Sequence, residues 1–235
     1  MLIQAPPTTT FLSLRNLEVI ARVRLYQGLI KEDAIDARIL RQIYNSRPSI
    51  FVEERPELLH IKSLTELWRL SADLKKRLRY AQRTGMPDTF AKTMSNYVKQ
   101  LSRLIHKQAV KIPLYKRLSE ELFLQGPSVA YIITHANLTC GRHKLLKNFQ
   151  LYNRGYRRRS PRSRMLILLA YAVVRNKHPK YYETYKKYHA KFREMQTKNP
   201  RWKALLRTSE RILLDMHKIA VKENAADHQA GGTSS

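Results

Sequence analysis

Two long apolar patterns, separated by a turn signal, constrain the fold of this chain more than any other feature. Within residues 58–83 and again within residues 90–105, apolar side chains recur at steps of three and four residues. That spacing places them on one face of a helix, and the segment 85–88 between the two patterns breaks the helix. We expect an antiparallel helical hairpin or a longer coiled coil, with Asp88 as the N-cap residue of the second helix. A helical core with solvated charges accounts for this pair without an active site.

The chain after this pair also has the pattern of a helical protein. Pro113 opens a helix that we expect to end at Phe123, and Gly126-Pro127-Ser128 starts the next helical run. Further helices are expected over residues 144–156, 165–176, 181–195 and 202–222. A disordered tail is expected from residue 223 onward. The predicted fold class is therefore mainly α.

The first fifty residues have a different pattern. Residues 1–12 have the composition of a loose leader. A strand is expected over residues 17–29, where polar or basic neighbours alternate with Val19, Ala21, Val23 and Leu25. Ile20 interrupts this alternation. After the turn signal at Gly28 we expect a helix over residues 31–44, whose buried face would carry Ile35, Ile39 and Ile43.

Positive charge is concentrated in the second half of the chain. The formal net charge is +27, and residues 141–222 contain 23 Lys and Arg against 4 Asp and Glu. Charge at this density opposes compaction unless an anion neutralises it, and nucleic-acid phosphates are the common partner. We therefore expect a nucleic-acid-binding protein, with a ribosome-like or membrane-surface basic protein as the alternative.

The remaining composition excludes several kinds of protein. The single cysteine, Cys140, excludes an intramolecular disulfide and a cysteine-rich zinc site. The longest apolar stretch, residues 165–174, is too short to cross a bilayer, and the N-terminus lacks the layout of a secretory signal. We expect a cytoplasmic location and no membrane partner.

Asp33 and Asp36 form the sharpest candidate for chemistry. On the helix expected over residues 31–44 they lie one turn apart on the same face. Two carboxylates held together can bind a divalent cation, and phosphodiester cleavage by two Mg²⁺ ions needs several carboxylates. Acidic residues also favour the first turn of a helix, where they complement its dipole, and the spacing alone favours this structural role.

A basic segment near residue 160 is the clearest candidate for binding. Six arginines occur within eleven residues, namely Arg154, Arg157, Arg158, Arg159, Arg162 and Arg164. Arginine forks match phosphate oxygens in two-point contacts, and the interleaved Tyr152 and Tyr156 can stack on bases or pack beneath the loop. We expect this segment to bind nucleic-acid phosphates, with a solvated surface loop as the alternative.

A second basic and aromatic stretch covers residues 180–191, where lysines alternate with tyrosines. We expect Tyr181, Tyr185 and Tyr188 to lie in the core. The histidines of the chain do not form a pair at i and i+4 and have no cysteine partner, so no metal site is predicted for them. We expect them to be surface residues or to be satisfied by structural hydrogen bonds.

The order of these features resembles one protein family. Residues 31–40, which include Asp33, Asp36 and Ala37, are similar to the Lys-x-Asp-x-x-Asp-Ala-x-x-Leu signature of the insertion sequence one-ten family of DEDD-type transposases. In that family the signature is followed by a long helical hairpin, a glycine-rich turn and a basic C-terminal transposase domain. The corresponding parts of this chain, in the same order, are residues 58–111, 125–131 and 148–222.

The resemblance implies a RuvC-like, RNase H-like nuclease fold with four acids. Asp33 and Asp36 match the last two of these acids and would hold Mg²⁺. The first two acids have no match, and most of the RNase H-like sheet would lie upstream of Met1, so the chain looks N-terminally truncated. The family also uses a C-terminal serine as a proposed nucleophile, and Ser160 is the candidate here. DNA is the implied partner, homo-oligomers are expected, and some members of the family work with a structured guide RNA.

These inferences define four expected regions. They are a remnant of a RuvC-like nuclease domain at 1–50, a helical hairpin or coiled-coil spacer at 57–111, a basic helical transposase domain at 113–222 and a disordered tail at 223–235. The expected function is DNA binding in the transposition and recombination of a bacterial insertion sequence, by metal-assisted strand cleavage and transfer. Because two acids have no match, the alternative is a non-catalytic basic nucleic-acid-binding protein, either a degenerate transposase fragment or an RNA-binding module.

Overall fold

Helices dominate the protein in the computed structural model, which describes residues 11–14, 18–54, 56–151 and 160–231. The prediction of a mainly α fold is therefore confirmed. The chain divides into two compact units, Met1–Leu59 and His60–Ser235. Among the described residues, no helix combines the length and the apolar composition that a bilayer span requires.

The first unit contains a pair of antiparallel strands and two helices. Strand β1 (Phe11–Leu14) pairs with β2 (Phe51–Glu54), with Phe11 opposite Glu54 and Leu14 opposite Phe51. Helices α1 (Glu18–Tyr26) and α2 (Asp33–Ser46) lie between the two strands in the sequence. A short 3-10 helix, Pro48–Ile50, leads into β2.

Helix α1 occupies the segment for which the alternating pattern predicted a strand, so that prediction is wrong. Ile20 of α1 is buried with Ile39 and Ile43 of α2, and Val19 and Val23 pack against the same cluster. A helix brings all three apolar residues of α1 to one side, whereas a strand would divide them between two faces. Ile20, which interrupted the alternation, is the residue that distinguishes the two structures. The buried face predicted for α2 is confirmed.

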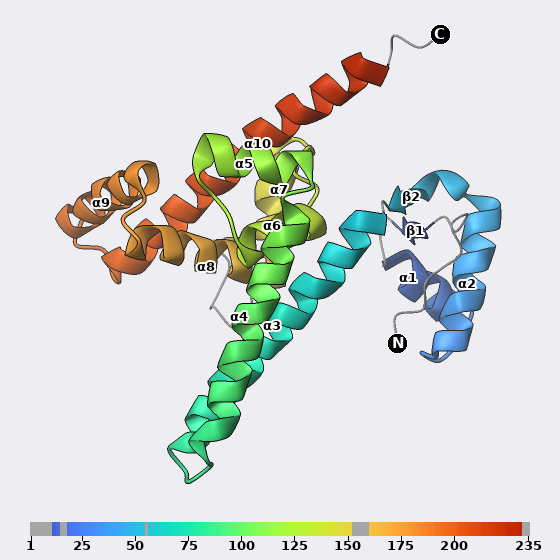
Figure 1. The fold of residues 1–235 in the computed structure, drawn as a ribbon. Coiled ribbons are helices and arrows are strands. Elements are labelled where there is room, and N and C mark those ends of the chain that lie inside the picture. The colour runs from blue at the N-terminus through green and yellow to red at the C-terminus, as the bar shows by residue number, and fades with distance from the viewer. Residues whose placement is uncertain (1–10, 15–17, 55, 152–159, 232–235) are drawn as a thin grey trace. The chain divides into compact units, whose positions relative to one another are not determined.

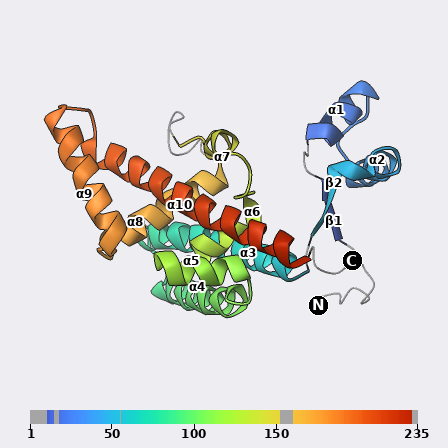
Figure 2. The same ribbon diagram turned by 90° about the horizontal axis from the view of Figure 1, so that it is seen from above.

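Helices α3 (Pro56–Gln82) and α4 (Asp88–Ala109) form the predicted hairpin, and the two helices lie side by side in Figures 1 and 2. The indole N–H of Trp68 on α3 donates a hydrogen bond of 2.9 Å to Ser102 Oγ on α4. The turn depends on Gly85, whose φ of +99° is strained for a residue with a side chain. The Gly85 N–H donates to the carbonyl of Gln82 at 3.2 Å and so closes the end of α3.

Asp88 does not cap α4, contrary to the prediction. Pro87 is the N-cap residue, and Asp88 is the first residue of the helix, where its carboxylate pairs with Lys92 Nζ at 2.6 Å. In this position the acid still complements the positive end of the helix dipole. The predicted helix boundary therefore differs by one residue from the observed one.

Shorter helices and one long helix complete the second unit. They are α5 (Pro113–Leu122), α6 (Pro127–His135), α7 (Arg142–Phe149), α8 (Pro161–Arg175), α9 (Pro179–Glu194) and α10 (Pro200–Gly231). All but α7 begin with proline, which fits the first helical position because the N–H it lacks would have no partner there.

Two predicted helix ends are wrong. Helix α7 ends at Phe149, where Gln150 takes the left-handed conformation with φ +43°, instead of continuing toward Gly155. Helix α10 continues past Lys222 to Gly231, into the segment predicted to be a disordered tail. Alanine and other good helix formers follow Lys222 in the sequence, and these residues favour continuation of the helix.

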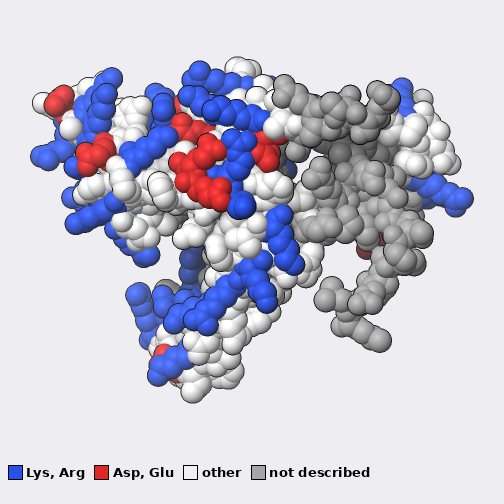
Figure 3. Space-filling view, turned by 45° about the horizontal axis from the view of Figure 1, so that its top comes forward, with Lys and Arg blue, Asp and Glu red and all other residues white. Residues whose placement is uncertain are grey.

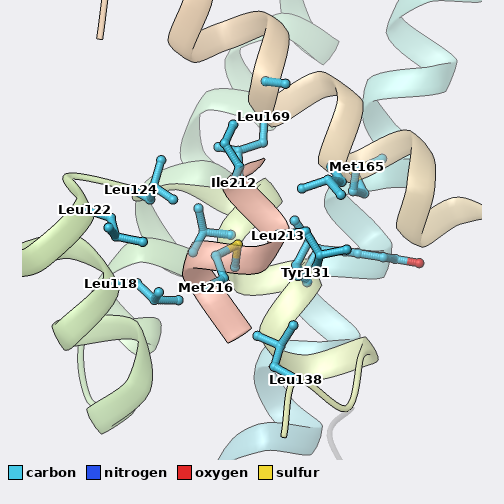
Figure 4. Packing of buried hydrophobic residues seen from close by; sticks show 14 of the residues in the cluster. Leu118, Leu122, Leu124, Tyr131, Leu138, Met165, Leu169, Ile212, Leu213 and Met216 are labelled. Carbon is cyan, nitrogen blue, oxygen red and sulfur yellow. The ribbon is translucent and has the colours of Figure 1, made fainter. Parts of the chain in front are cut away.

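One large apolar cluster holds the second unit together. Figure 4 shows side chains of α5, α6, α8 and α10 meeting in it, among them Leu118, Tyr131, Leu169, Ile212 and Met216. Burying one such aliphatic side chain contributes about 1.5–3 kcal/mol. Tyr131 lies at one side of the cluster, and its hydroxyl points away from the other labelled side chains (Figure 4). That hydroxyl belongs to the site described next.

Candidate nucleic-acid interface

The two acids of the signature segment lie in the first turn of α2, and their surroundings differ. Asp33 is the first residue of α2 and is exposed. Asp36, one turn further on, forms an ion pair with Arg24 of α1, in which Oδ1 and Nε are 3.0 Å apart. The helix therefore places the two carboxylates one turn apart as predicted, but one of them already faces a cation.

This arrangement fits a divalent cation only in part. Mg²⁺ takes oxygen ligands in a nearly octahedral arrangement, and Asp33 and Asp36 can supply two of them. Within the described part of the chain there is no group of three or more His, Cys, Asp and Glu side chains that could hold a metal ion. A cation at Asp36 would also compete with Arg24 for the carboxylate.

Two of the six arginines predicted to bind phosphate lie at the start of α8. Arg162 is exposed and Arg164 is partly buried, and both belong to the first turn of the helix. The other four lie outside the described residues, namely Arg154, Arg157, Arg158 and Arg159. The structure thus places one exposed guanidinium of this segment, that of Arg162, on the second unit.

Ser160, the predicted nucleophile, is the N-cap residue of α8. Its Oγ accepts a hydrogen bond of 3.2 Å from the Ser163 N–H and shares a second hydrogen bond of 2.8 Å with Ser163 Oγ. Ser163 is buried, and its hydroxyl donates to the carbonyl of Phe149 at the end of α7. Ser160 therefore satisfies a backbone N–H that the helix leaves without a partner. Its role as a nucleophile stays a prediction.

A polar cluster that the sequence did not predict joins α3 to α6. The Tyr131 hydroxyl donates a hydrogen bond of 2.9 Å to Glu66 Oε1, and the Arg69 Nε–H donates one of 2.7 Å to Glu66 Oε2. His135 stacks on the Tyr131 ring, with centroids 3.9 Å apart, and its Nε2 lies 3.3 Å from Glu66 Oε1. We call these four residues the α6 cluster.

The charges around the α6 cluster shift the pKa values of its members. Burial raises the pKa of the Glu66 carboxyl, but the hydrogen bonds from Arg69 and Tyr131 outweigh burial and bring the pKa below its ordinary value. Burial, together with the neighbouring Glu66 carboxylate, raises the pKa of Tyr131 to about 12. Burial also lowers the pKa of His135, and the positive charges of Lys62 and Arg162 act in the same direction.

Both ring nitrogens of His135 face hydrogen-bond acceptors. Nδ1 lies 3.0 Å from the Tyr131 carbonyl and 3.0 Å from Thr134 Oγ1, and Nε2 lies 3.3 Å from Glu66 Oε1. A neutral imidazole carries one proton and can donate on one side only, whereas the protonated ring can donate on both.

Sequence reasoning missed the α6 cluster because its members come from distant parts of the chain. Glu66 and Tyr131 are separated by 65 positions, and no local spacing relates them. The available signal was the pair Tyr131 and His135, which lie four residues apart and therefore on one helix face. The prediction that the histidines are satisfied by structural hydrogen bonds is confirmed for His135, and also for His217, whose Nδ1 lies 2.7 Å from the Leu138 carbonyl.

Cations are exposed along several helices of the second unit. On α9 they are Lys180, Lys186, Lys187, Lys191 and Arg193. Figure 3 shows Lys and Arg over much of the described surface in that view, and Asp and Glu in a few groups only. The prediction that tyrosines of this helix lie in the core is confirmed for Tyr181, which is fully buried, and for Tyr185, which packs against the large apolar cluster, but not for Tyr188. Tyr188 is partly buried.

A buried acid fastens α9 to α10. Asp215 of α10 is 5 % exposed, and its Oδ2 lies 2.8 Å from Lys180 Nζ and 3.3 Å from Arg211 Nε. The Tyr181 hydroxyl donates to the same oxygen at 3.3 Å. Burial and this carboxylate together raise the pKa of Tyr181. One of the few acids of the basic region is therefore buried, where it joins two helices and pairs with two half-exposed cations.

Comparison with known proteins assigns no family. No protein-family model matches the chain, and no curated protein matches it. The similarity to insertion sequence one-ten transposases therefore rests on the ordered motifs alone, and the roles it implies for Asp33, Asp36 and Ser160 stay predictions.

Proposed function

We propose that this protein binds nucleic acid through the basic surface of its second unit, and that it acts on DNA in the transposition and recombination of a bacterial insertion sequence. The first part of the proposal rests on charge, and the second on the resemblance of the ordered motifs. In this proposal residues 1–50 correspond to part of a RuvC-like nuclease domain. A cytoplasmic location fits a DNA partner and a chain with a single cysteine.

The observation that carries the proposal is the imbalance of exposed charge on the second unit. Residues 141–222 contain 23 Lys and Arg against 4 Asp and Glu. Three of these acids already face cations, since Asp215 is buried against Lys180, Glu183 pairs with Lys186 at 2.7 Å and Glu210 pairs with Arg207 at 2.9 Å. Such a surface attracts polyanions from a distance and gains further from the counterions that a phosphate backbone releases.

The experiment compares two variants that lose the same amount of charge. One replaces the arginines of the basic segment by glutamine at 157, 158, 159 and 162, and the other replaces four cations of the hairpin at 76, 77, 79 and 83. We expect the first variant to lose much more affinity for duplex DNA, to a similar extent for every sequence, because phosphate contacts carry no sequence information. Equal losses of affinity in the two variants would show that the basic segment is not part of the interface.

For cleavage we propose that Asp33 and Asp36 hold Mg²⁺ together with further oxygen ligands that the DNA backbone or a second protein chain supplies. Mg²⁺-dependent nicking of supercoiled DNA by the chain, compared with the Asp33→Ala variant, tests this role. Nicking that is unchanged by the substitution would contradict the proposal that Asp33 holds Mg²⁺. The ion pair between Asp36 and Arg24 favours the second candidate function, a basic protein that binds nucleic acid without cleaving it.

A structured guide RNA is a further proposed partner. Arginine contacts to phosphate do not distinguish DNA from RNA, so the same basic surface fits both. Sequencing of RNA that copurifies with the chain tests this proposal, and enrichment of one folded transcript is the expected result. Recovery of an unselected mixture of cellular RNA would contradict a guide role and leave only charge-driven binding.

We also propose that the hairpin pairs with a second copy of the chain. On α4 the apolar side chains of Phe90, Tyr97 and Leu104 recur at seven-residue steps and are 59 %, 39 % and 39 % exposed. A seven-residue repeat of exposed apolar residues is typical of a helix–helix interface. Light scattering should give a dimer or larger assembly for the wild type and a monomer for Phe90→Glu with Tyr97→Glu. Equal masses would contradict the proposal.

A further inference from the structure

Two adjacent cavities share the side chain of Trp202 where α10 begins. The first has a volume of about 490 Å³ and is lined by His189, Arg193, Asn199, Pro200, Arg201 and Trp202. It lies where α9 and α10 meet, two helices that pack against each other in Figures 1 and 2. Two arginines and a histidine therefore line one concave site.

The second cavity is apolar and aromatic. It has a volume of about 520 Å³ and is lined by Ile167, Leu168, Tyr171, Trp202 and Leu205, from α8 and α10. Tyr171 is 56 % exposed although its ring lines the cavity. Both volumes fall within the range of roughly 300–1,000 Å³ that is common for sites of small ligands.

The local structure brings the lining residues of the first cavity together. Asn199 takes the left-handed conformation with φ +57°, and α10 begins directly after it, so Arg201 and Trp202 stand in its first turn. Arg193 lies in the last turn of α9, and His189 stacks against Tyr185 with centroids 5.7 Å apart. The surroundings are strongly basic, because residues 189–203 contain five Lys and Arg and one acid, and that acid does not line the cavity.

We propose that these two cavities form a subsite for one unpaired nucleotide of a single-stranded nucleic acid. The phosphate binds in the first cavity, between Arg193 and Arg201, and the base lies in the second cavity against Trp202 and Tyr171. A nucleotide has this combination of an anionic group next to a flat aromatic group, and stacking on aromatic side chains is how proteins bind unpaired bases. The inference rests on the nucleic-acid binding proposed above and extends it.

The chemistry of the two cavities favours a single strand over a duplex. Only the edges of the bases are accessible in a duplex, whereas an aromatic cavity needs the face of a base. An acidic peptide with an aromatic side chain would also fit one anionic and one apolar site. The net charge of +27 favours the nucleic acid, because every further phosphate of a strand adds to the attraction.

The test uses the full chain and measures affinity for three probes: a short oligothymidylate, an oligouridylate of the same length and a blunt duplex. Tyr171→Ser removes one stacking surface, and Tyr80→Ser, at a tyrosine that is 70 % exposed on the hairpin, is its control. Arg193→Gln with Arg201→Gln removes the phosphate contacts, and Arg77→Gln with Arg103→Gln removes the same charge from the hairpin. Trp202→Leu keeps apolar packing at that position without a stacking surface.

We expect Tyr171→Ser and Trp202→Leu each to weaken binding of the single strands about tenfold, the size expected for one stacked base, and to leave duplex affinity unchanged. Oligothymidylate should quench tryptophan fluorescence in the wild type and not in Trp202→Leu. Whichever of the two single strands binds with higher affinity shows whether the nucleotide belongs to DNA or to RNA. The arginine pair should weaken single-strand binding more than the hairpin pair does.

Three outcomes would overturn the subsite. The first is an equal loss of affinity in Tyr171→Ser and Tyr80→Ser. The second is that the cavity variants lose as much affinity for the duplex as for the single strands. The third is that an acidic aromatic peptide quenches the fluorescence of Trp202 and neither single strand does. In each of these outcomes the wild-type chain still binds the duplex, so the proposed function would survive them. A wild-type chain that binds none of the three nucleic acids would contradict both proposals.

Discussion

Tyr131 and Glu66, which are 65 positions apart in the chain, are joined by a hydrogen bond of 2.9 Å from the phenol to the carboxylate. This bond connects α6, whose residues are all buried or partly buried, to the long hairpin helix α3. Because Arg69 donates to the other oxygen of the same carboxylate, the α6 cluster fixes the orientation of Glu66. The apolar cluster and the hairpin of the second unit therefore share a polar contact as well as apolar ones.

Removing the phenol of Tyr131 should destabilise the protein. In Tyr131→Phe the Glu66 carboxylate keeps Arg69 but loses one donor, so we expect the free energy of unfolding to fall by about 1–2 kcal/mol. Urea denaturation followed by circular dichroism measures this change. Tyr80→Phe, at an exposed position of the same hairpin, is the control and should have no effect. Equal stability of the two variants would contradict a structural role for the bond.

Acid should weaken the fold through His135. Its folded pKa lies below the ordinary value of 6.5, so the unfolded chain takes up a proton at a higher pH than the folded chain does. The stabilisation is therefore complete above the unfolded pKa of about 6.5 and is lost as the pH falls through the folded pKa. We expect the free energy of unfolding to decrease less between about pH 7 and pH 5 in His135→Asn than in the wild type. Identical slopes would show that this histidine is not involved.

Loss of the buried Asp215 carboxylate should lower the free energy of unfolding more than loss of any exposed acid. Asp215→Asn leaves Lys180 and Arg211 without their shared carboxylate, and because both cations are about half exposed, water offsets part of the loss. We expect a decrease of about 2 kcal/mol in the free energy of unfolding. Glu183→Gln, which breaks the exposed pair with Lys186, should leave the free energy of unfolding nearly unchanged. Thermal denaturation of both variants is the measurement, and a reversed order would refute the assignment.

Ser160 caps α8 and is also the proposed nucleophile, and one set of variants separates the two roles. As the cap of α8 it should tolerate Asp, which also accepts from a backbone N–H, and Ser160→Ala should cost about 1 kcal/mol of stability. If Ser160 were only a cap, Ser160→Asp would keep both the stability and any strand-transfer activity. Loss of activity in Ser160→Asp at unchanged stability is what the proposed nucleophile requires. A stable Ser160→Ala variant would contradict the cap.

Periodic sequence patterns predicted the helices well, because each long helix buries one apolar face. The hairpin of α3 and α4 and the buried face of α2 with Ile39 and Ile43 were predictable for this reason. The strand predicted over residues 17–29 failed because Val19 and Val23 share one helix face with Ile20, whereas Ala21 and Leu25 of the alternating set are exposed. Whether this segment forms a strand or a helix depends on the element against which it packs, and that element is α2.

The candidate site was less predictable than the fold. Arginine density near Arg162 and the spacing of Asp33 and Asp36 are local properties, so the sequence shows them. The ion pair of Asp36 with Arg24, the capping role of Ser160 and the α6 cluster depend on which helices meet, and no local spacing reports this. The cavities at Trp202 have the same origin, because α8, α9 and α10 each contribute to them.

The most direct test of the central claim, that the second unit binds nucleic-acid phosphates, is the salt dependence of duplex binding by the full chain. If six or more phosphates are contacted, the association constant should fall about a thousandfold or more between about 50 and 200 mM salt, linearly on a double-logarithmic plot. The variant without the arginines at 157, 158, 159 and 162 should give a shallower slope on every duplex. Affinity that is absent, or that does not change with salt, would contradict the claim.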